Sequence, residues 1–227
     1  MKEYLRAVNK TNEVILRGLN ISNNELDRFA KSDYRWATNK ENSHTKRTIH
    51  KGDIFQFEFG KNYSPEMSYE HRGLVIGVKN KLLYVLPICS YDKIKHPDVF
   101  HPTDYPECKS DWYLLKASEY NFIKHDSVLK LNDLRTVSVN RILYHQKDGK
   151  IEVSSEMYKC IEKLVITKYF PTFMYEFEQF CEQNTILKKK CEEQESTIEA
   201  MKQEYNIIYT CTEIQTDPGR GGTGSRT

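Results

Sequence analysis

The chain has 227 residues, of which 38% are hydrophobic and 29% are charged, which is enough for one core of good size and an appendage. Its 34 lysines and arginines nearly balance its 32 aspartates and glutamates, so the overall charge indicates no polyanionic partner. No apolar run approaches the roughly 18 residues of a membrane span, and the N-terminal segment does not resemble a signal peptide. We therefore expect a cytoplasmic protein with no membrane partner.

Residues 1–50 are expected to form a helix followed by a basic linker. In residues 1–30, apolar side chains recur mostly at intervals of three and four, which is typical of an amphipathic helix. These side chains are Tyr4, Leu5, Val8, Val14, Ile15, Leu16 and Leu19. Residues 31–50 are polar and basic, which indicates a linker.

Residues 51–170 are expected to form a strand-rich domain. The segment GDIFQFEFG alternates apolar and polar residues, and two apolar runs, LVIGV and LLYVLPI, flank a KNK turn in residues 69–90. Because no helical segment separates these strands from the later ones, we expect an antiparallel sheet closed into a small barrel. Ser154, Ser155 and Glu156 then begin a helix, so the predicted fold class is α+β.

Residues 171–210 carry a heptad repeat, in which positions after Phe173 follow at alternating intervals of four and three. These positions are Phe177, Phe180, Asn184, Leu187, Cys191, Gln194, Ile198, Met201, Tyr205 and Ile208. The pattern predicts a coiled-coil helix, and Asn184 at an a position favours a parallel two-stranded coil. The alternative is a long amphipathic helix packed on its own domain. Residues 211–227 are glycine-rich and are expected to form a flexible tail.

Cysteines and histidines give no metal-binding pattern. The six cysteines contain no C-x-x-C pair and fit no zinc spacing, so we expect free thiols in a reducing compartment. The segment HPDVFHPTD, residues 96–104, contains two His-Pro pairs, and proline after each histidine favours extended, loop-like backbone. A solvated loop is the interpretation that we prefer for it, and we expect no metal and no cofactor.

The predicted hairpin in residues 69–90 places chemically active side chains together. Arg72 precedes its first apolar run, and Cys89 and Ser90 follow its second. Because a hairpin sets the start of its first strand beside the end of its second, we expect a guanidinium and two nucleophile-type side chains to be neighbours.

The middle of the chain resembles the MazF/PemK toxins of type II toxin–antitoxin systems over residues 50–168. The resemblance rests on KGDI at the first strand, on HR before the second, on a proline and a hydroxyl residue ending the third, and on the late segment DSVLKLNDLRTV. It implies an SH3-like barrel, of the kind shared with CcdB, that dimerises. It also implies sequence-specific, metal-independent cleavage of single-stranded RNA, and a cognate antitoxin as partner.

By position, the resemblance assigns the family's catalytic arginine to Arg72 and its catalytic threonine to Cys89, with Ser90 adjacent. Neighbouring strand residues point to opposite faces, so only one of the two can face Arg72; we favour Cys89, and a bulge after Pro87 would instead turn Ser90 toward it. A thiol is a poorer donor than a hydroxyl, and Gly73 stands where the family usually has proline. The chemistry fits these residue types, because the substrate's 2′-hydroxyl can attack and leave a cyclic phosphate and a 5′-hydroxyl. The protein then has to hold the phosphate and stabilise its charge, which a forked guanidinium does well.

The RNA itself is expected to contact two loops and one strand, because single-stranded RNA needs cations and stacking surfaces. The candidate RNA-binding residues are Lys61, Tyr63, Glu66, Tyr69, His71, Tyr91, Lys93, Lys95, Arg135 and Thr136. For Thr136, an ordinary exposed strand position is an equal alternative.

Two other functions remain open at this point. The domain could be a non-catalytic, dimeric module that binds nucleic acid or protein, which the cysteine at the hydroxyl position favours. It could also be a gyrase-poisoning relative on the same barrel, because one fold hosts several activities.

Overall fold

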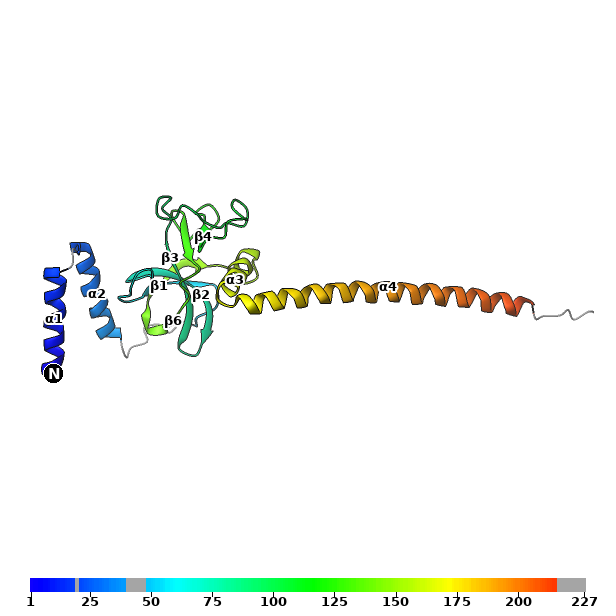
Figure 1. The fold of residues 1–227 in the computed structure, drawn as a ribbon, viewed down its shortest axis with the longest axis horizontal. Coiled ribbons are helices and arrows are strands. Elements are labelled where there is room, and N and C mark those ends of the chain that lie inside the picture. Colours follow the sequence, from blue (N-terminus) through cyan, green and yellow to red (C-terminus); the bar gives the residue numbers. More distant parts are fainter. Residues whose placement is uncertain (19–20, 40–47, 216–227) are drawn as a thin grey trace, which may run out of the picture. The chain divides into compact units, whose positions relative to one another are not determined.

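The computed structural model describes residues 1–18, 21–39 and 48–215 (Figure 1). Its elements are α1 (Lys2–Gly18), α2 (Asn23–Asn39), β1 (Asp53–Glu58), β2 (Glu70–Lys79), β3 (Leu82–Ser90), β4 (Trp112–Leu115), β5 (Ser127–Lys130), β6 (Arg135–Ser138), the 3₁₀ turn η1 (Val139–Arg141), β7 (Ile142–Lys150), α3 (Glu156–Tyr169) and α4 (Pro171–Gln215). The chain forms two compact units that divide between Tyr169 and Phe170. The fold class is α+β, with four helices and a seven-stranded antiparallel sheet in the described residues.

The N-terminal region contains two helices where the sequence predicted one. α2 continues to Asn39, so the prediction of a linker is wrong for residues 31–39. Local composition misled the prediction, because the polar surface of α2 supplies contacts to the sheet. Leu19 and residues 40–47 lie outside the described residues.

The sheet is open, so the expectation of a closed barrel is wrong. The strand order is β4-β5-β3-β2-β1-β7, and β6 pairs with β3 off this path. The nine-residue strand β3 pairs with β6 through its first half and with β5 through its second half. The sheet therefore branches at β3. Its path ends at β7 on one side and at β4 on the other, where Tyr113 of β4 also forms an isolated bridge with Phe100.

Both faces of the sheet carry apolar clusters, because neighbouring residues of a strand point to opposite faces. One face packs Leu74 and Ile88 against Tyr158 and Ile161 of α3. The other face gathers aromatic and branched residues of β1, β2, β3 and β6. α3 begins as the sequence predicts, since the Ser155 hydroxyl accepts a hydrogen bond from the Tyr158 amide at 3.2 Å.

The described part of the second unit consists mainly of one helix, α4. This helix ends at Gln215, beyond the predicted end at residue 210. The apolar heptad positions whose side chains are described, such as Phe177, Leu187 and Ile198, are exposed on it. The helix is therefore continuous over the repeat, while a second coil strand is not shown. Of the predicted flexible tail, residues 216–227 lie outside the described residues. None of the described helices has both the length and the apolar character that crossing a membrane requires.

Candidate functional site

The β2–β3 hairpin brings Arg72 to the end of β3. In the antiparallel register Arg72 lies opposite Ile88, and on the far side of β3 Ser90 lies opposite Ser127 of β5. Positions two residues apart on a strand share a face. Arg72, Ser90 and Ser127 therefore share one face of the sheet, where β3 ends and β2 and β5 begin.

Ser127 connects two functional groups on this face. Its hydroxyl accepts a hydrogen bond from Arg72 Nη2 at 3.1 Å and donates one to the backbone oxygen of His125 at 3.1 Å. The side chain of His125 also lies on this face, because its Nε2 is 2.9 Å from Ser90 Oγ. Ser127 is fully buried, whereas Ser90 and His125 are exposed. The result is a solvent-facing group of Arg72, Ser90 and His125, in which the buried Ser127 hydroxyl holds Arg72 and the backbone of His125. We call this group the Arg72 site.

Arg72 is a half-buried cation that forms no ion pair with any carboxylate of the described residues. Burial lowers the pKa of its guanidinium, and Cys89 and Tyr144 oppose that effect. By contrast, Arg35 and Arg135 both bind carboxylates. An uncompensated charge in a partly desolvated position is costly unless it meets an anion, so this arrangement suits an anionic ligand.

Close packing explains why the residue directly after Arg72 is glycine. A Cβ on Gly73 would lie 2.4 Å from a methyl of Val85 and 2.9 Å from the Phe57 ring. Neither Val85 nor Phe57 could move without disturbing the buried cluster on the face opposite Arg72. Glycine is therefore required by close packing between β1, β2 and β3, and its presence does not by itself change the Arg72 site.

The preference for Cys89 as the residue that faces Arg72 is wrong, because Cys89 lies at the same end of the hairpin but points to the opposite face of the sheet. It packs beside Val99, Leu114 and Val128, while Ile88 belongs to the cluster on the face of Arg72. Burial raises the pKa of the Cys89 thiol, and the charges of Lys130, Arg72 and Lys95 only oppose this. The thiol is therefore held in its protonated form on the side of the sheet away from Ser127.

The ring of His96 contacts the sulfur of Cys89. The sequence did not predict this role for His96. Its Nδ1 accepts a hydrogen bond from the Asp92 amide at 3.1 Å, so in the neutral ring Nε2 carries the proton. That Nε2 lies 3.9 Å from Cys89 Sγ. His96 is 6% exposed and packs against the rings of Tyr91 and Trp112.

The expectation of a solvated loop is thus wrong for both histidines of the HPDVFHP segment, since His101 is fully buried as well. Local sequence shows the extended backbone but not the burial, which depends on Trp112 and Glu119 from later segments.

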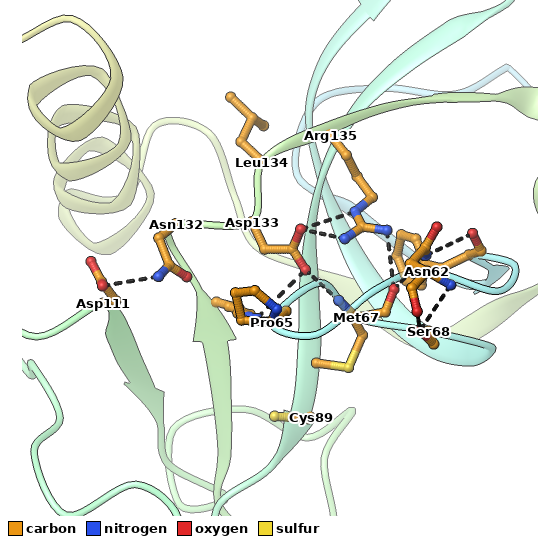
Figure 2. Close-up of polar contacts among 12 residues, drawn as sticks. Asn62, Pro65, Met67, Ser68, Cys89, Asp111, Asn132, Asp133, Leu134 and Arg135 are labelled. Atoms are coloured by element: carbon orange, nitrogen blue, oxygen red, sulfur yellow. Dashed lines mark hydrogen bonds and ion pairs between the residues drawn. The ribbon is translucent and has the colours of Figure 1, made fainter. Parts of the chain in front are cut away.

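Arg135, predicted to bind RNA, has an internal role. Its guanidinium is bound to Asp133 and donates from Nη1 to the Met67 oxygen at 3.0 Å, while the Met67 amide donates to Asp133 Oδ2 at 2.8 Å (Figure 2). Lys130 adds a hydrogen bond to the Pro65 oxygen. These contacts, which we call the Asp133 clamp, fasten the loop after β1 to the turn before β6.

Helix α2 contacts Lys61, which is another of the residues predicted to bind RNA. Lys61 pairs with Asp33 at 2.5 Å and lies over the Phe29 ring at 3.7 Å. Arg35 bridges Glu58 at 3.0 Å and Glu70 at 2.6 Å, which seats α2 on β1 and β2.

The remaining candidates divide by exposure. Tyr69 and His71 are half-buried; burial raises the pKa of Tyr69 and lowers that of His71, and charges on α2 contribute to both shifts. Tyr91 is half-buried on the His96 ring. The exposed candidates are Tyr63, Glu66, Lys93, Lys95 and Thr136.

Across the described ranges, no three histidine, cysteine or acidic side chains gather in a way that could hold a metal ion. No model of a known protein family matches the chain, and no curated protein matches it.

Proposed function

We propose that the chain is an endoribonuclease that cleaves single-stranded RNA without a metal ion, with the Arg72 site as its phosphate-binding centre. One observation carries the proposal: Arg72 is half-buried, has no carboxylate partner among the described residues, and is held by Ser127 at 3.1 Å beside two exposed polar side chains. The resemblance of residues 50–168 to MazF/PemK toxins supports RNA as the source of the anion.

The mechanism follows from what these side chains can donate. The substrate's 2′-hydroxyl attacks the adjacent phosphorus, the bond to the 5′-oxygen breaks, and a 2′,3′-cyclic phosphate and a 5′-hydroxyl result. Arg72 still has free N–H donors after its bond to Ser127, and a guanidinium fork can hold two phosphate oxygens. The Ser90 hydroxyl, on the same face, can donate to the same phosphate. Both would stabilise charge that grows in the transition state.

The rest of the RNA would contact exposed side chains of the loops at the open end of the β2–β3 hairpin. Lys93 and Lys95 stand exposed in the loop that continues from β3, and Tyr63 is 90% exposed in the loop after β1. Cations and aromatic rings are the usual contacts of single strands. A cytoplasmic location and a cognate antitoxin belong to the same proposal and rest on the resemblance.

We also propose that the protein is a homodimer through a parallel coil of α4. Support comes from the exposed heptad positions of a helix that is continuous for 45 residues. A single helix that leaves such a row of Phe, Leu and Ile in water gains their burial by pairing with a second copy. Dimerisation through the sheet domain is the second contact that the resemblance implies.

The test of the enzymatic proposal is cleavage of single-stranded RNA by the purified chain in EDTA. We expect fragments with 5′-hydroxyl ends, and a loss of ~10²-fold or more in Arg72→Ala. Arg72→Lys should be nearly as damaging, because an ammonium lacks the fork.

Lys79→Ala is the matched control, since it removes an exposed cation from the other end of β2. Wild-type rates in Arg72→Ala, or activity lost in EDTA and restored by Mg²⁺, would overturn the proposal.

A non-catalytic binding module is the second candidate. It is favoured by the engagement of Lys61 with α2 and of Arg135 with the Asp133 clamp, which leaves fewer cations for a cleaving groove. RNA binding that depends on Arg72 but produces no fragments would identify it.

A further inference from the structure

We propose that His125 is the proton-accepting residue of the Arg72 site, taking the proton of the attacking 2′-hydroxyl. This inference rests on the proposed function and adds a residue to it, because cleavage of RNA by its own 2′-hydroxyl was expected to need only charge stabilisation. The position of His125 follows from the tertiary structure, as it lies 35 residues after Ser90 in the chain.

The geometry places one ring nitrogen where a proton has to move. His125 Nε2 lies 2.9 Å from Ser90 Oγ, and Ser90 pairs across the strands with Ser127, which holds Arg72. A phosphate on the Arg72 fork would therefore sit next to both Ser90 and His125. Because a general base has to lie within hydrogen-bond reach of the proton it accepts, His125 meets the geometric condition once the Ser90 hydroxyl turns its single proton from Nε2 to the bound phosphate.

The backbone of His125 is fixed independently of its ring. The Ser127 hydroxyl donates to the His125 carbonyl oxygen at 3.1 Å, and the following Asp126 accepts from the Ala117 amide at 2.8 Å. The charged groups nearest along the chain are Lys124 and Asp126, both exposed. The ring is thus exposed to solvent while its attachment to the backbone is rigid, which suits a group that meets the substrate repeatedly.

The other histidines of this region are unsuitable. His96 uses Nδ1 for the Asp92 amide and Nε2 for Cys89, on the other face. His101 is fully buried between acidic side chains. His71 is half-buried near α2, and burial lowers its pKa. Of these four histidines, His125 alone is exposed.

The proposed step balances as a transesterification. The 2′-hydroxyl proton passes to His125 Nε2, the 2′-oxygen forms its bond to phosphorus, and the bond from phosphorus to the 5′-oxygen breaks with its electron pair on that oxygen. The 5′-oxygen takes a proton from water or from the imidazolium, and no oxidant or metal is consumed. Arg72 meanwhile holds the non-bridging oxygens.

The experiment compares wild type with His125→Ala, His125→Gln and Ser90→Ala on a short single-stranded RNA. We expect the histidine variants to lose ~10²-fold in kcat, with binding of the all-deoxy oligonucleotide unchanged. The rate of each variant is followed across pH, and His125→Gln should lose as much rate as His125→Ala, because neither side chain can accept the proton. Added imidazole should restore part of the rate to His125→Ala and none to Arg72→Ala.

Each outcome separates the inference from the function beneath it. If His125→Ala keeps the wild-type rate and pH profile while Arg72→Ala is inactive, His125 is not the base and the endoribonuclease proposal stands. If wild type cleaves no RNA at any pH, both fall. Because the His125 ring is exposed and its backbone contact survives substitution, the histidine variants should keep the wild-type thermal midpoint.

Discussion

Arg72 and Cys89 lie at the same end of the β2–β3 hairpin but on opposite faces of the sheet. The register pairs Arg72 with Ile88, so alternation along β3 turns Cys89 away and Ser90 back toward Arg72. The sulfur then packs against His96 at 3.9 Å, and the Ser90 hydroxyl meets His125 at 2.9 Å. The position that the resemblance to MazF/PemK toxins would assign to a catalytic threonine therefore carries a side chain that faces away from Arg72.

This relationship predicts which of the two residues matters for cleavage. Ser90→Ala should lower RNA cleavage ~10-fold or more, because it removes a donor to a charged oxygen. Cys89→Ala should stay within about threefold of wild type, since the thiol makes no contact on the face of Arg72. The measurement is the single-turnover rate on one RNA. A larger loss in Cys89→Ala than in Ser90→Ala would assign the site to the opposite face.

The Asp133 clamp predicts a stability effect without a catalytic one. Arg135→Ala leaves Asp133, which is 8% exposed, without its main cation. Breaking a buried pair of this kind costs about 3 kcal/mol of unfolding free energy, measured by urea unfolding. Arg72→Ala, which breaks no ion pair, should change that free energy by less than about 1 kcal/mol. Equal stability of Arg135→Ala and wild type would show that the clamp does not hold the loop.

Buried tyrosines predict a loss of stability at high pH. Burial raises the pKa of Tyr120 and of Tyr158 to about 12 each, against about 10 in an unfolded chain. The folded state therefore keeps protons that the unfolded chain releases. Their contribution is fully present below pH ~10 and is lost as the pH rises toward ~12, by up to ~1.4 kcal/mol per pH unit for each tyrosine.

Tyr120→Phe tests this titration. Among the described residues the Tyr120 hydroxyl is buried without a hydrogen-bond partner, so the substitution should leave stability at pH 7 unchanged or raised. Between pH 10 and 12, the unfolding free energy of the variant should fall less steeply than that of wild type, as followed by urea unfolding. Identical slopes would mean that Tyr120 does not titrate with the folding equilibrium.

The heptad repeat of α4 predicts a concentration-dependent dimer. Truncation after Pro171 should weaken self-association by at least ~10-fold in sedimentation equilibrium, while the thermal midpoint of the remaining domain stays within a few degrees. Asn184→Leu should raise coil stability and broaden the oligomer distribution, because the buried amide penalises other registers. A full-length chain that remains monomeric at micromolar concentration contradicts the coil.

Local sequence was sufficient for the features that depend on periodicity. The alternation around residues 69–90 predicted the hairpin, Ser155 predicted the start of α3, and the intervals after Phe173 predicted a continuous helix. Each of these signals comes from residues that are near each other in the chain, and so does the neighbourhood of Arg72 with Cys89 and Ser90.

The tertiary structure decided what depends on register and on distant partners. Whether Cys89 or Ser90 faces Arg72 follows from a pairing shift of one residue, which composition does not reveal. His125 and Ser127 are placed beside the hairpin by β5, and Arg135 forms an ion pair with Asp133. The sheet branches because β3 divides its two halves between β5 and β6, and it stays open because the terminal strands β4 and β7 do not pair with each other. Contacts of this kind join segments tens of residues apart, so only the folded chain determines them.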